Sequence, residues 1–210
     1  MIRTLLFDLG NVLLRFSHER MCAQMGALCG KSADDIRCLL FDTGLQLHFE
    51  RGTVSEDEFH RRFEQAVGAK VDLPALRLAA SDIFELNTSM PPLLDTLKER
   101  GYRLVLLSNT CAAHYEFVAQ KFDVLNRFDH HVVSFRVGAV KPEAAIFTAA
   151  LEAIRCKPSE CFYTDDIPAN VEAARRFGLQ AEVFTDVATL RSHLAARGIE
   201  LPTPETDRPA

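Results

Sequence analysis

The sequence lacks several features that would assign a protein to a membrane or to nucleic acid. Its 210 residues contain no apolar run that approaches the roughly 20 residues of a membrane helix. The N-terminus, MIRTLLFDLG, runs directly into an apolar strand pattern and lacks signal-peptide architecture. The formal net charge of −5 provides no basic field for holding nucleic acid. These absences predict a cytoplasmic protein that binds neither membrane nor nucleic acid.

The cysteines lack the spacing of a metal site. Neither a C-x-x-C pair nor a histidine-rich partner segment accompanies them, which argues against zinc. The six are Cys22, Cys29, Cys38, Cys111, Cys156 and Cys161. We expect reduced, packed thiols, because free cysteine behaves as a small hydrophobe. Cys111, which directly follows a predicted loop motif, is the candidate among them for a reactive thiol.

The chain is long enough for one sizeable core and an inserted subdomain. Hydrophobic residues make up 48% of it and charged residues 25%, which is ordinary for a globular protein. Residues 2–7 are typical of a buried strand, and the pattern then becomes helical from residue 17 to residue 87. The apolar periodicity lies in four segments, HERMCAQMGAL, ADDIRCLLF, SEDEFHRRFEQAVG and LPALRLAASDIFEL. The sequence therefore predicts four short helices inserted after the first strand.

Helix and strand patterns alternate after residue 87. Strands are predicted at 103–107, 131–135, 161–164 and 181–184, and helices at 91–100, 114–121, 143–154, 169–177 and 188–196. This alternation favours a doubly wound parallel α/β sheet, because parallel pairing needs crossover connections. We expect a core domain of residues 1–16 and 88–200, a helical domain of residues 17–87 and a disordered tail of residues 201–210. No exposed apolar stripe indicates an oligomeric state.

Polar side chains follow the predicted strands at the points where the strands end. Asp8 follows the apolar run LLF. Ser108 and Asn109 follow LVLL, and Asp165 and Asp166 follow CFYT. Because the carboxyl ends of parallel strands share one edge of a sheet, we expect these side chains to converge on one site.

Three carboxylates at one edge would repel one another unless a cation lay between them. Hard oxygen ligands of this kind suit Mg²⁺, which would in turn offset the charge of a phosphate beside Asp8. Lys141, which starts KPEAAIF, and the Ser108 hydroxyl can hold the remaining phosphate oxygens. Asp8 can attack phosphorus and form an aspartyl-phosphate that water then hydrolyses. These residues predict Mg²⁺-dependent phosphoryl chemistry on a small phosphate ester.

Four motifs in this order resemble those of the haloacid dehalogenase superfamily of hydrolases. They are DLGNV at 8–12, LLSNT at 106–110, KPE at 141–143 and YTDDIPANVEAA at 163–174. The resemblance implies a Rossmann-like core and a helical C1 cap, formed by the insertion after the first motif. It also implies a phosphatase, that is, a phosphoric monoester hydrolase.

The resemblance further implies a role for each site residue. Asp8 is the implied catalytic nucleophile, Asp166 the leading metal ligand, and Asn170 a residue that orients the metal shell. The implied substrate-binding residues are Ser108, Asn109 and Lys141. The implied Mg²⁺ ligands are Asp8, the carbonyl of Gly10, Asp165 and Asp166.

An acidic residue is missing at position 10. Most phosphatases of the superfamily carry there an aspartate that protonates the leaving alcohol, help that is typically worth about 10² to 10⁴ in rate. Gly10 can still offer its carbonyl to Mg²⁺ but has no proton to give. The same glycine occurs in the group with DLGNV, ERG (residues 50–52) and SNT motifs, which includes α-D-glucose-1-phosphate phosphatase. This likeness indicates a sugar phosphate as substrate.

Other interpretations stay open from the sequence. A 2-haloacid dehalogenase uses the same nucleophile without metal, which Gly10 allows and the Asp165–Asp166 pair argues against. A phosphate-binding protein could have kept the site and lost turnover. The two aspartates could also cap the next helix, and Lys141 could be exposed at a helix start. Charged side chains of the helical segment could reach the substrate or remain solvated; these are His18, Arg20, His48 and Arg51.

Overall fold

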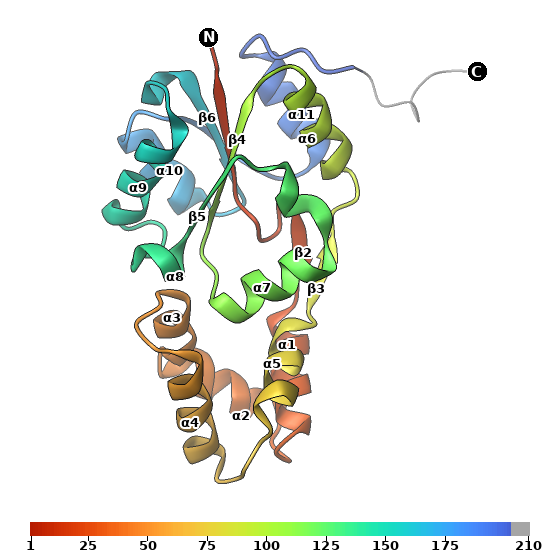
Figure 1. The fold of residues 1–210 in the computed structure, drawn as a ribbon, viewed down its shortest axis with the longest axis vertical. Helices are drawn as coiled ribbons and strands as arrows, with labels where there is room; N and C mark the ends of the chain where they lie inside the picture. The colour runs from red at the N-terminus through yellow and green to blue at the C-terminus, as the bar shows by residue number, and fades with distance from the viewer. Residues whose placement is uncertain (203–210) are drawn as a thin grey trace, which may run out of the picture.

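The computed structural model describes residues 1–202 and is built around a sheet of five parallel strands (Figure 1). The strand order is β5-β4-β1-β6-β7. The strands are β1 (Thr4–Phe7), β4 (Arg103–Ser108), β5 (His130–Val133), β6 (Cys161–Asp165) and β7 (Gln180–Val183). This sheet and its crossover helices confirm the predicted doubly wound α/β fold.

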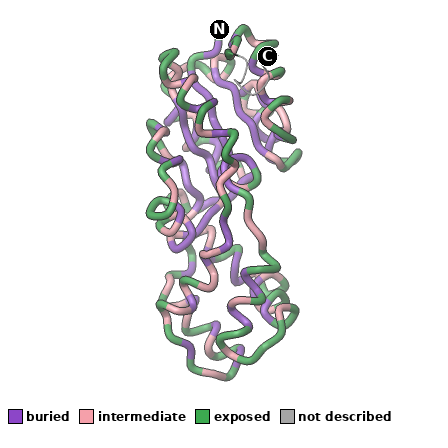
Figure 2. The backbone as a smooth tube through the Cα atoms, turned by 90° about the vertical axis from the view of Figure 1, so that its right-hand side faces the viewer, coloured by how far each residue is buried: buried purple, intermediate pink, exposed green. Residues whose placement is uncertain are grey.

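The central strand β1 is apolar on both sides, because helices cover both faces of the sheet. Leu5 and Phe7 pack into one core cluster and Leu6 into another, and all three are fully buried. The first face packs against α6 (Met90–Glu99), α7 (Ala112–Lys121) and α11 (Val187–Ala195). The second packs against α9 (Ala144–Ile154) and α10 (Pro168–Arg176). Figure 2 shows the buried backbone concentrated along these strands.

Strand β5 is shorter than predicted. It ends at Val133, and the next residues form the single helical turn α8 (Ser134–Val137) rather than more strand. The Ser134 hydroxyl accepts a hydrogen bond from the Thr110 N–H at 2.9 Å, which ties this turn to the end of β4. The remaining short helices near the sheet are η2 (Asp123–Arg127) and η3 (Pro158–Glu160).

The helical segment forms one end of the molecule, below the sheet in Figure 1. Its helices are α1 (His18–Ala27), α2 (Ala33–Arg37), the π-helical turn η1 (Cys38–Asp42), α3 (Leu45–Glu50), α4 (Glu56–Val67) and α5 (Leu73–Ser81). The prediction of four helices missed α3, which begins after Gly44 in a left-handed conformation with φ of 74°. At six residues, α3 is too short to show a helical repeat in the sequence.

The last predicted helix of this segment also ends earlier than expected. Helix α5 stops at Ser81, and β3 (Phe84–Leu86) pairs antiparallel with β2 (Leu14–Phe16). The chain enters and leaves the helical segment through these two strands (Figure 1). One hydrophobic cluster runs from the sheet through this connection into the helices. The division into two domains at residues 17 and 87 stays a prediction.

Two further predictions concern the ends of the chain and the membrane. Apart from its first two residues, the predicted disordered tail, 201–210, lies outside the described residues. Among the helices of residues 1–202, none combines the length and apolar character needed to cross a bilayer.

The last residue of α3 and the two residues after it connect the helical segment to the part of the chain that forms the sheet. The Ser134 hydroxyl donates to the Glu50 carbonyl at 2.6 Å. The Arg51 guanidinium binds both carboxylate oxygens of Glu143, at 3.0 and 2.5 Å. Gly52 lies so close to the backbone of Phe135 that a Cβ atom there would be 2.3 Å from its carbonyl oxygen. The ERG motif is therefore a docking segment.

We expect Gly52→Ala to destabilise the protein more than Gly68→Ala does. Both glycines have positive φ, 75° and 72°, but a Cβ at Gly68 meets nothing within 4 Å. Gly68→Ala therefore measures the left-handed strain alone, about 1–2 kcal/mol. Gly52→Ala adds a backbone clash of about 1–3 kcal/mol. Urea unfolding of the two variants measures the difference, and equal losses would contradict the docking contact.

Candidate active site

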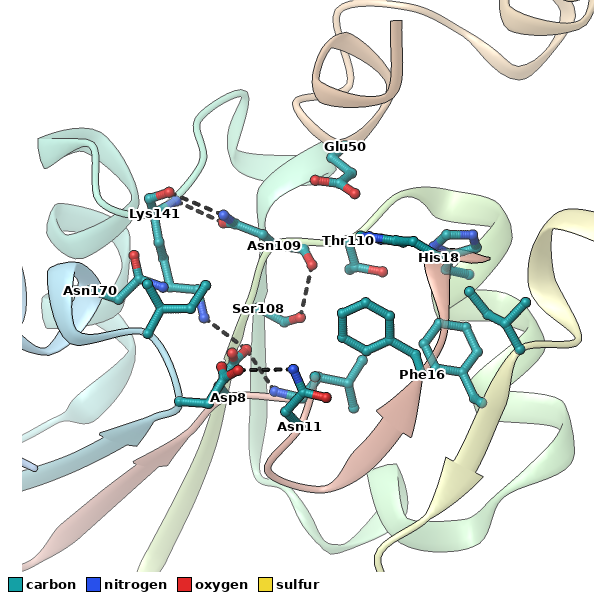
Figure 3. A pocket seen from close by; sticks show the side chains of 17 residues that line it. Asp8, Asn11, Phe16, His18, Glu50, Ser108, Asn109, Thr110, Lys141 and Asn170 are labelled. Atoms are coloured by element: carbon teal, nitrogen blue, oxygen red, sulfur yellow. Dashed lines mark hydrogen bonds and ion pairs between the residues drawn. The ribbon is translucent and has the colours of Figure 1, made fainter. Parts of the chain in front are cut away.

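The predicted site residues surround one pocket at the carboxyl edge of the sheet (Figure 3). The pocket has a volume of about 200 Å³. The predicted residues that line it are Asp8, Gly10, Ser108, Asn109, Lys141, Asp166 and Asn170. Asp165 is fully buried and is not among the pocket-lining residues. Strand order explains this convergence, because β1 lies between β4 and β6 and all three end at the same edge.

Lys141 bridges two carboxylates at the base of the pocket. Its Nζ lies 2.7 Å from Asp8 Oδ1 and 2.7 Å from Asp165 Oδ2, and it also donates to the Leu107 carbonyl at 3.0 Å. The side chain is 1% exposed, so water does not solvate the ammonium. Burial opposes the charged form, yet the two carboxylates together raise the pKa of Lys141. The predicted phosphate contact would require Lys141 to share or release one of these three bonds.

Asp165 has its carboxylate fully engaged by the protein. Besides Lys141, its oxygens accept hydrogen bonds from the Tyr163 hydroxyl, the Ile167 N–H at 2.8 Å and Asn170 Nδ2 at 3.1 Å. Burial alone would raise the pKa of Asp165, but Lys141, the Tyr163 hydroxyl and the Ile167 N–H lower it. Asp165 is thus a buried anion that holds Lys141 and Asn170 in place.

Asp8 is oriented from two sides. Its Oδ1 accepts the Leu9 N–H at 2.7 Å in addition to the bond from Lys141. Burial raises the pKa of Asp8 to about 7, Lys141 opposes this rise, and the nearby charge of Asp165 adds to it. A cation that bound beside Asp8 would favour its ionised form.

Asp166 is half-buried and borders the pocket, unlike its neighbour. Asn11, held at a positive φ of 54°, donates from Nδ2 to Asp166 Oδ2 at 2.9 Å. Carboxylate oxygens of Asp8, Asp165 and Asp166 lie within 4.8 Å of one another. Hard, anionic oxygens are the ligand type that Mg²⁺ prefers, and Asp8 and Asp166 are the two that face the pocket.

The motif at the end of β4 contributes one weakly bonded hydroxyl and one engaged amide. Ser108 is 1% exposed, and its hydroxyl makes a long bond of 3.3 Å to the Asn109 carbonyl. The Asn109 side chain donates to the Lys141 carbonyl at 3.1 Å and accepts the Lys141 N–H at 2.7 Å. Asn109 therefore fixes the backbone that carries Lys141, while Ser108 is available to an anion. Thr110, from the same motif, also lines the pocket.

Gly10 lies against the ring of Phe16 in β2. A Cβ at position 10 would be 2.8 Å from Phe16 Cε1, closer than van der Waals contact permits. An aspartate could not occupy position 10 without displacing this ring, which itself lines the pocket. Local packing thus disfavours an acid at position 10, and the motif DLGNV by itself gives no sign of this contact.

The residues of the helical segment have different surroundings. His18 and Glu50 line the pocket. Arg20 lies near Asp82 and Glu85, and His48 contacts Thr53. Of the residues proposed to reach a substrate, His18 is the one at the pocket. Glu50 was missed as a site residue, although it belongs to the ERG motif.

The cysteines are all free thiols. Cys111 is fully buried, and burial raises its pKa to about 12. The expectation of a reactive thiol at Cys111 is therefore wrong, because the thiolate is the nucleophilic form.

A parallel sheet with three carboxylates and a buried lysine at its carboxyl edge defines an α/β enzyme site that can bind a cation and an anion together. The sequence matches the haloacid dehalogenase-like hydrolases over residues 2–178, and the chain belongs to this family. The predicted hydrolase class and superfamily are confirmed. The likeness to the α-D-glucose-1-phosphate phosphatase group stays a prediction.

Relatives of known activity include phosphatases. The chain is 24% identical to D-ribitol-5-phosphate phosphatase of Bacteroides thetaiotaomicron, over 86% of this chain and 90% of that protein. It is 26% identical to drimenol cyclase drtB of Aspergillus calidoustus, over 88% of this chain but only 34% of the cyclase. The chain thus spans about a third of that larger relative. The phosphatase relative agrees with the predicted enzyme class.

A similar solved structure contains the predicted ligands. It is a HAD family enzyme of Bacteroides thetaiotaomicron in complex with magnesium and inorganic phosphate, with a TM-score of 0.82 and 27% identity. The match covers 90% of this chain and 99% of that chain. The fold that carries Asp8 and its neighbours is therefore one on which both ligands bind in a relative.

We expect the contact between Gly10 and Phe16 to appear as a coupling energy. Gly10→Ala should lower the free energy of unfolding by about 1–3 kcal/mol, because the added methyl meets the ring. In a Phe16→Leu background, the same change should be nearly neutral. A double-mutant cycle by urea unfolding gives the coupling, and additive losses would show that the ring is not the obstacle.

Proposed function

We propose that this hydrolase cleaves a small phosphomonoester, a sugar phosphate, through an aspartyl-phosphate on Asp8, with Mg²⁺ as cofactor. The observation that carries the proposal is the convergence of Asp8, Lys141 and Asp166 on one pocket. The relatives that act on D-ribitol 5-phosphate or bind magnesium and phosphate support this choice of chemistry.

The residues of this chain that would hold Mg²⁺ are Asp8, Asp166 and the carbonyl of Gly10. Asp165 would contribute only its negative charge, from its buried position behind the pocket wall, since its oxygens already accept hydrogen bonds from the protein. When bound, Mg²⁺ supplies positive charge that offsets the negative charge of the phosphate ester. The Asn11 amide orients Asp166 for this role.

The two chemical steps use Asp8 and water. The Leu9 N–H and Lys141 fix the Asp8 carboxylate, so little motion separates its resting position from attack on phosphorus. Attack forms the bond from Asp8 to phosphorus and breaks the bond to the leaving alcohol. Water then attacks the phosphoryl group, restores the carboxylate and releases phosphate. Ser108 donates its hydroxyl to a phosphate oxygen in both steps.

The pocket suits a small substrate. Its volume of about 200 Å³ lies below the range of about 300–1,000 Å³ that drug-sized ligands occupy. Phe16 and Phe84 form apolar walls, while Thr110 and Glu50 offer hydrogen-bonding groups to hydroxyls. The helical segment, docked over the pocket by residues 50–52, acts as the cap that excludes bulk water.

Replacement of Asp8 tests the nucleophile. Asp8→Asn should abolish release of phosphate from p-nitrophenyl phosphate with Mg²⁺, a loss on the order of 10³-fold or more, because the amide cannot attack phosphorus. Asp34→Asn, at a side chain that is 92% exposed, is the matched control and should keep full activity. An active Asp8→Asn variant would refute the aspartyl-phosphate.

Activity assays of the unmodified protein distinguish a phosphatase from a dehalogenase and from a phosphate-binding protein. Phosphate release from a panel of sugar phosphates with Mg²⁺ is the expected result. Chloride release from 2-chloropropionate without metal, and no phosphate release, would instead identify a dehalogenase. Phosphate binding without turnover of any ester would identify a binding protein.

The two adjacent aspartates should respond differently to the same change. Asp165→Asn should lower the free energy of unfolding by about 3–5 kcal/mol, because it removes one anion from a buried ion pair. Asp166→Asn should leave thermal stability nearly unchanged and raise the Mg²⁺ concentration that gives half-maximal activity. Thermal melts and Mg²⁺ titrations separate the two effects. A stable Asp165→Asn variant would contradict the structural role of Asp165.

A further inference from the structure

The proposed reaction needs a proton that the first motif does not supply. Breaking the bond from phosphorus to an alkyl oxygen leaves an alkoxide, which is a poor leaving group unless an acid protonates it. Gly10 has no side chain, and the Phe16 ring fills the space where an acid would stand. The proton donor must therefore come from another wall of the pocket.

The groups at the base of the pocket are committed to other contacts. The three acceptors around Lys141 Nζ account for its three N–H bonds. Asp8 and Asp166 are the proposed nucleophile and metal ligand. The hydroxyls of Ser108 and Thr110 are too weakly acidic to protonate an alkoxide by themselves.

The two histidines that line the pocket are poor proton donors. Burial lowers the pKa of His114 to about 4, and its Nε2 lies 3.1 Å from the Ala80 carbonyl. The His18 ring packs between Phe16 and Phe41, at centroid distances of 4.9 and 4.8 Å, and burial lowers its pKa as well. Both shifts favour the neutral imidazole, which is a weak proton donor.

Glu50 is the remaining acidic group at the pocket. Figure 3 shows its carboxyl group at the end of α3, across the pocket from Asp8. Its one side-chain partner in the described residues is Gln46 Nε2, which donates to Glu50 Oε1 at 2.8 Å. Burial raises the pKa of Glu50, and the bond from Gln46 opposes this rise. A carboxyl group without a cationic partner in such surroundings holds its proton more readily than one in water.

The backbone around Glu50 is fixed to the sheet domain. The Ser134 hydroxyl binds the Glu50 carbonyl, and the neighbouring Arg51 forms a two-bond ion pair with Glu143. Glu143 lies two residues after Lys141, so the loop that carries the buried lysine also anchors the segment that carries Glu50. This shared anchor gives Glu50 a defined position relative to Asp8.

We propose that Glu50 is the general acid and base of this enzyme, in place of the acid that position 10 lacks; the proposal rests on the proposed phosphatase function. As Asp8 attacks, the electron pair of the breaking P–O bond goes to the leaving oxygen, which takes the Glu50 proton and departs as a neutral alcohol. The Glu50 carboxylate then takes a proton from the water that attacks the aspartyl-phosphate. Glu50 is protonated again when Asp8 and phosphate are released.

The test compares leaving groups. Glu50→Gln keeps the shape and a hydrogen-bond donor but has no acidic proton. We expect kcat/KM to fall by about 10² to 10⁴ for an alkyl phosphate such as glycerol 3-phosphate, and to change little for p-nitrophenyl phosphate, whose leaving group needs no proton. A purely structural role for Glu50 would reduce both rates alike. Glu85→Gln, at a carboxylate that is 73% exposed, is the matched control and should affect neither rate.

Two outcomes would overturn the proposal. Equal losses on both substrates, or an unchanged alkyl rate, in a Glu50→Gln protein that melts like the wild type would exclude Glu50 as the acid while leaving the phosphatase function in place. A wild-type protein that hydrolyses neither ester would overturn both. If Glu50→Gln does not fold, Glu50→Ala assayed with added imidazole, which is partly protonated near neutral pH, replaces it. Recovery of the alkyl rate alone supports the proposal, and no recovery contradicts it.

Discussion

The ion pairs of one buried ammonium group determine the geometry of this site. Lys141 lies between Asp8 and Asp165, and removing one partner from such a buried arrangement typically costs about 3–5 kcal/mol. The neighbouring contacts serve this arrangement: Asn109 holds the Lys141 backbone, and Tyr163 and other donors hold Asp165. The strand order allows Lys141 to reach both carboxylates, since β1 and β6 are adjacent and end at the same edge of the sheet. The nucleophile is thus positioned before any ligand binds.

The same loop joins the sheet domain to the helical segment. Residues 141–143 provide the buried ammonium at one end and, at the other, the carboxylate that binds Arg51. A change in how the helical segment docks would act on this loop directly, without passing through the sheet. The hydrophobic cluster that continues through β2 and β3 adds a second connection. The two parts of the molecule are therefore coupled at both sides of the pocket.

The fold and the base of the site could be predicted because both follow from local patterns. Alternating helix and strand signals specify the parallel sheet, and polar residues at strand ends mark its active edge. The different surroundings of Asp165 and Asp166 could not be predicted from the residues themselves, because the two differ in burial rather than in chemistry. Only the family resemblance distinguished Asp166, as the leading metal ligand. Helix α3 and the β2–β3 pair were missed because each is short and depends on contacts distant in sequence. Glu50 reaches the pocket only through such contacts.

The glycine at position 10 has a physical consequence for how catalysis would be organised. An acid at that position would be two residues from the nucleophile and fixed with it at the sheet edge. Glu50 instead stands on the docked helical segment, so its distance from Asp8 depends on the contacts of Ser134 and Arg51. With the segment displaced, the site would keep its nucleophile and lose its acid. Cleavage of esters with poor leaving groups would then require the docked arrangement, in which Ser134 and Arg51 hold the end of α3. Placing the acid on the docked helical segment in this way links proton transfer to substrate enclosure.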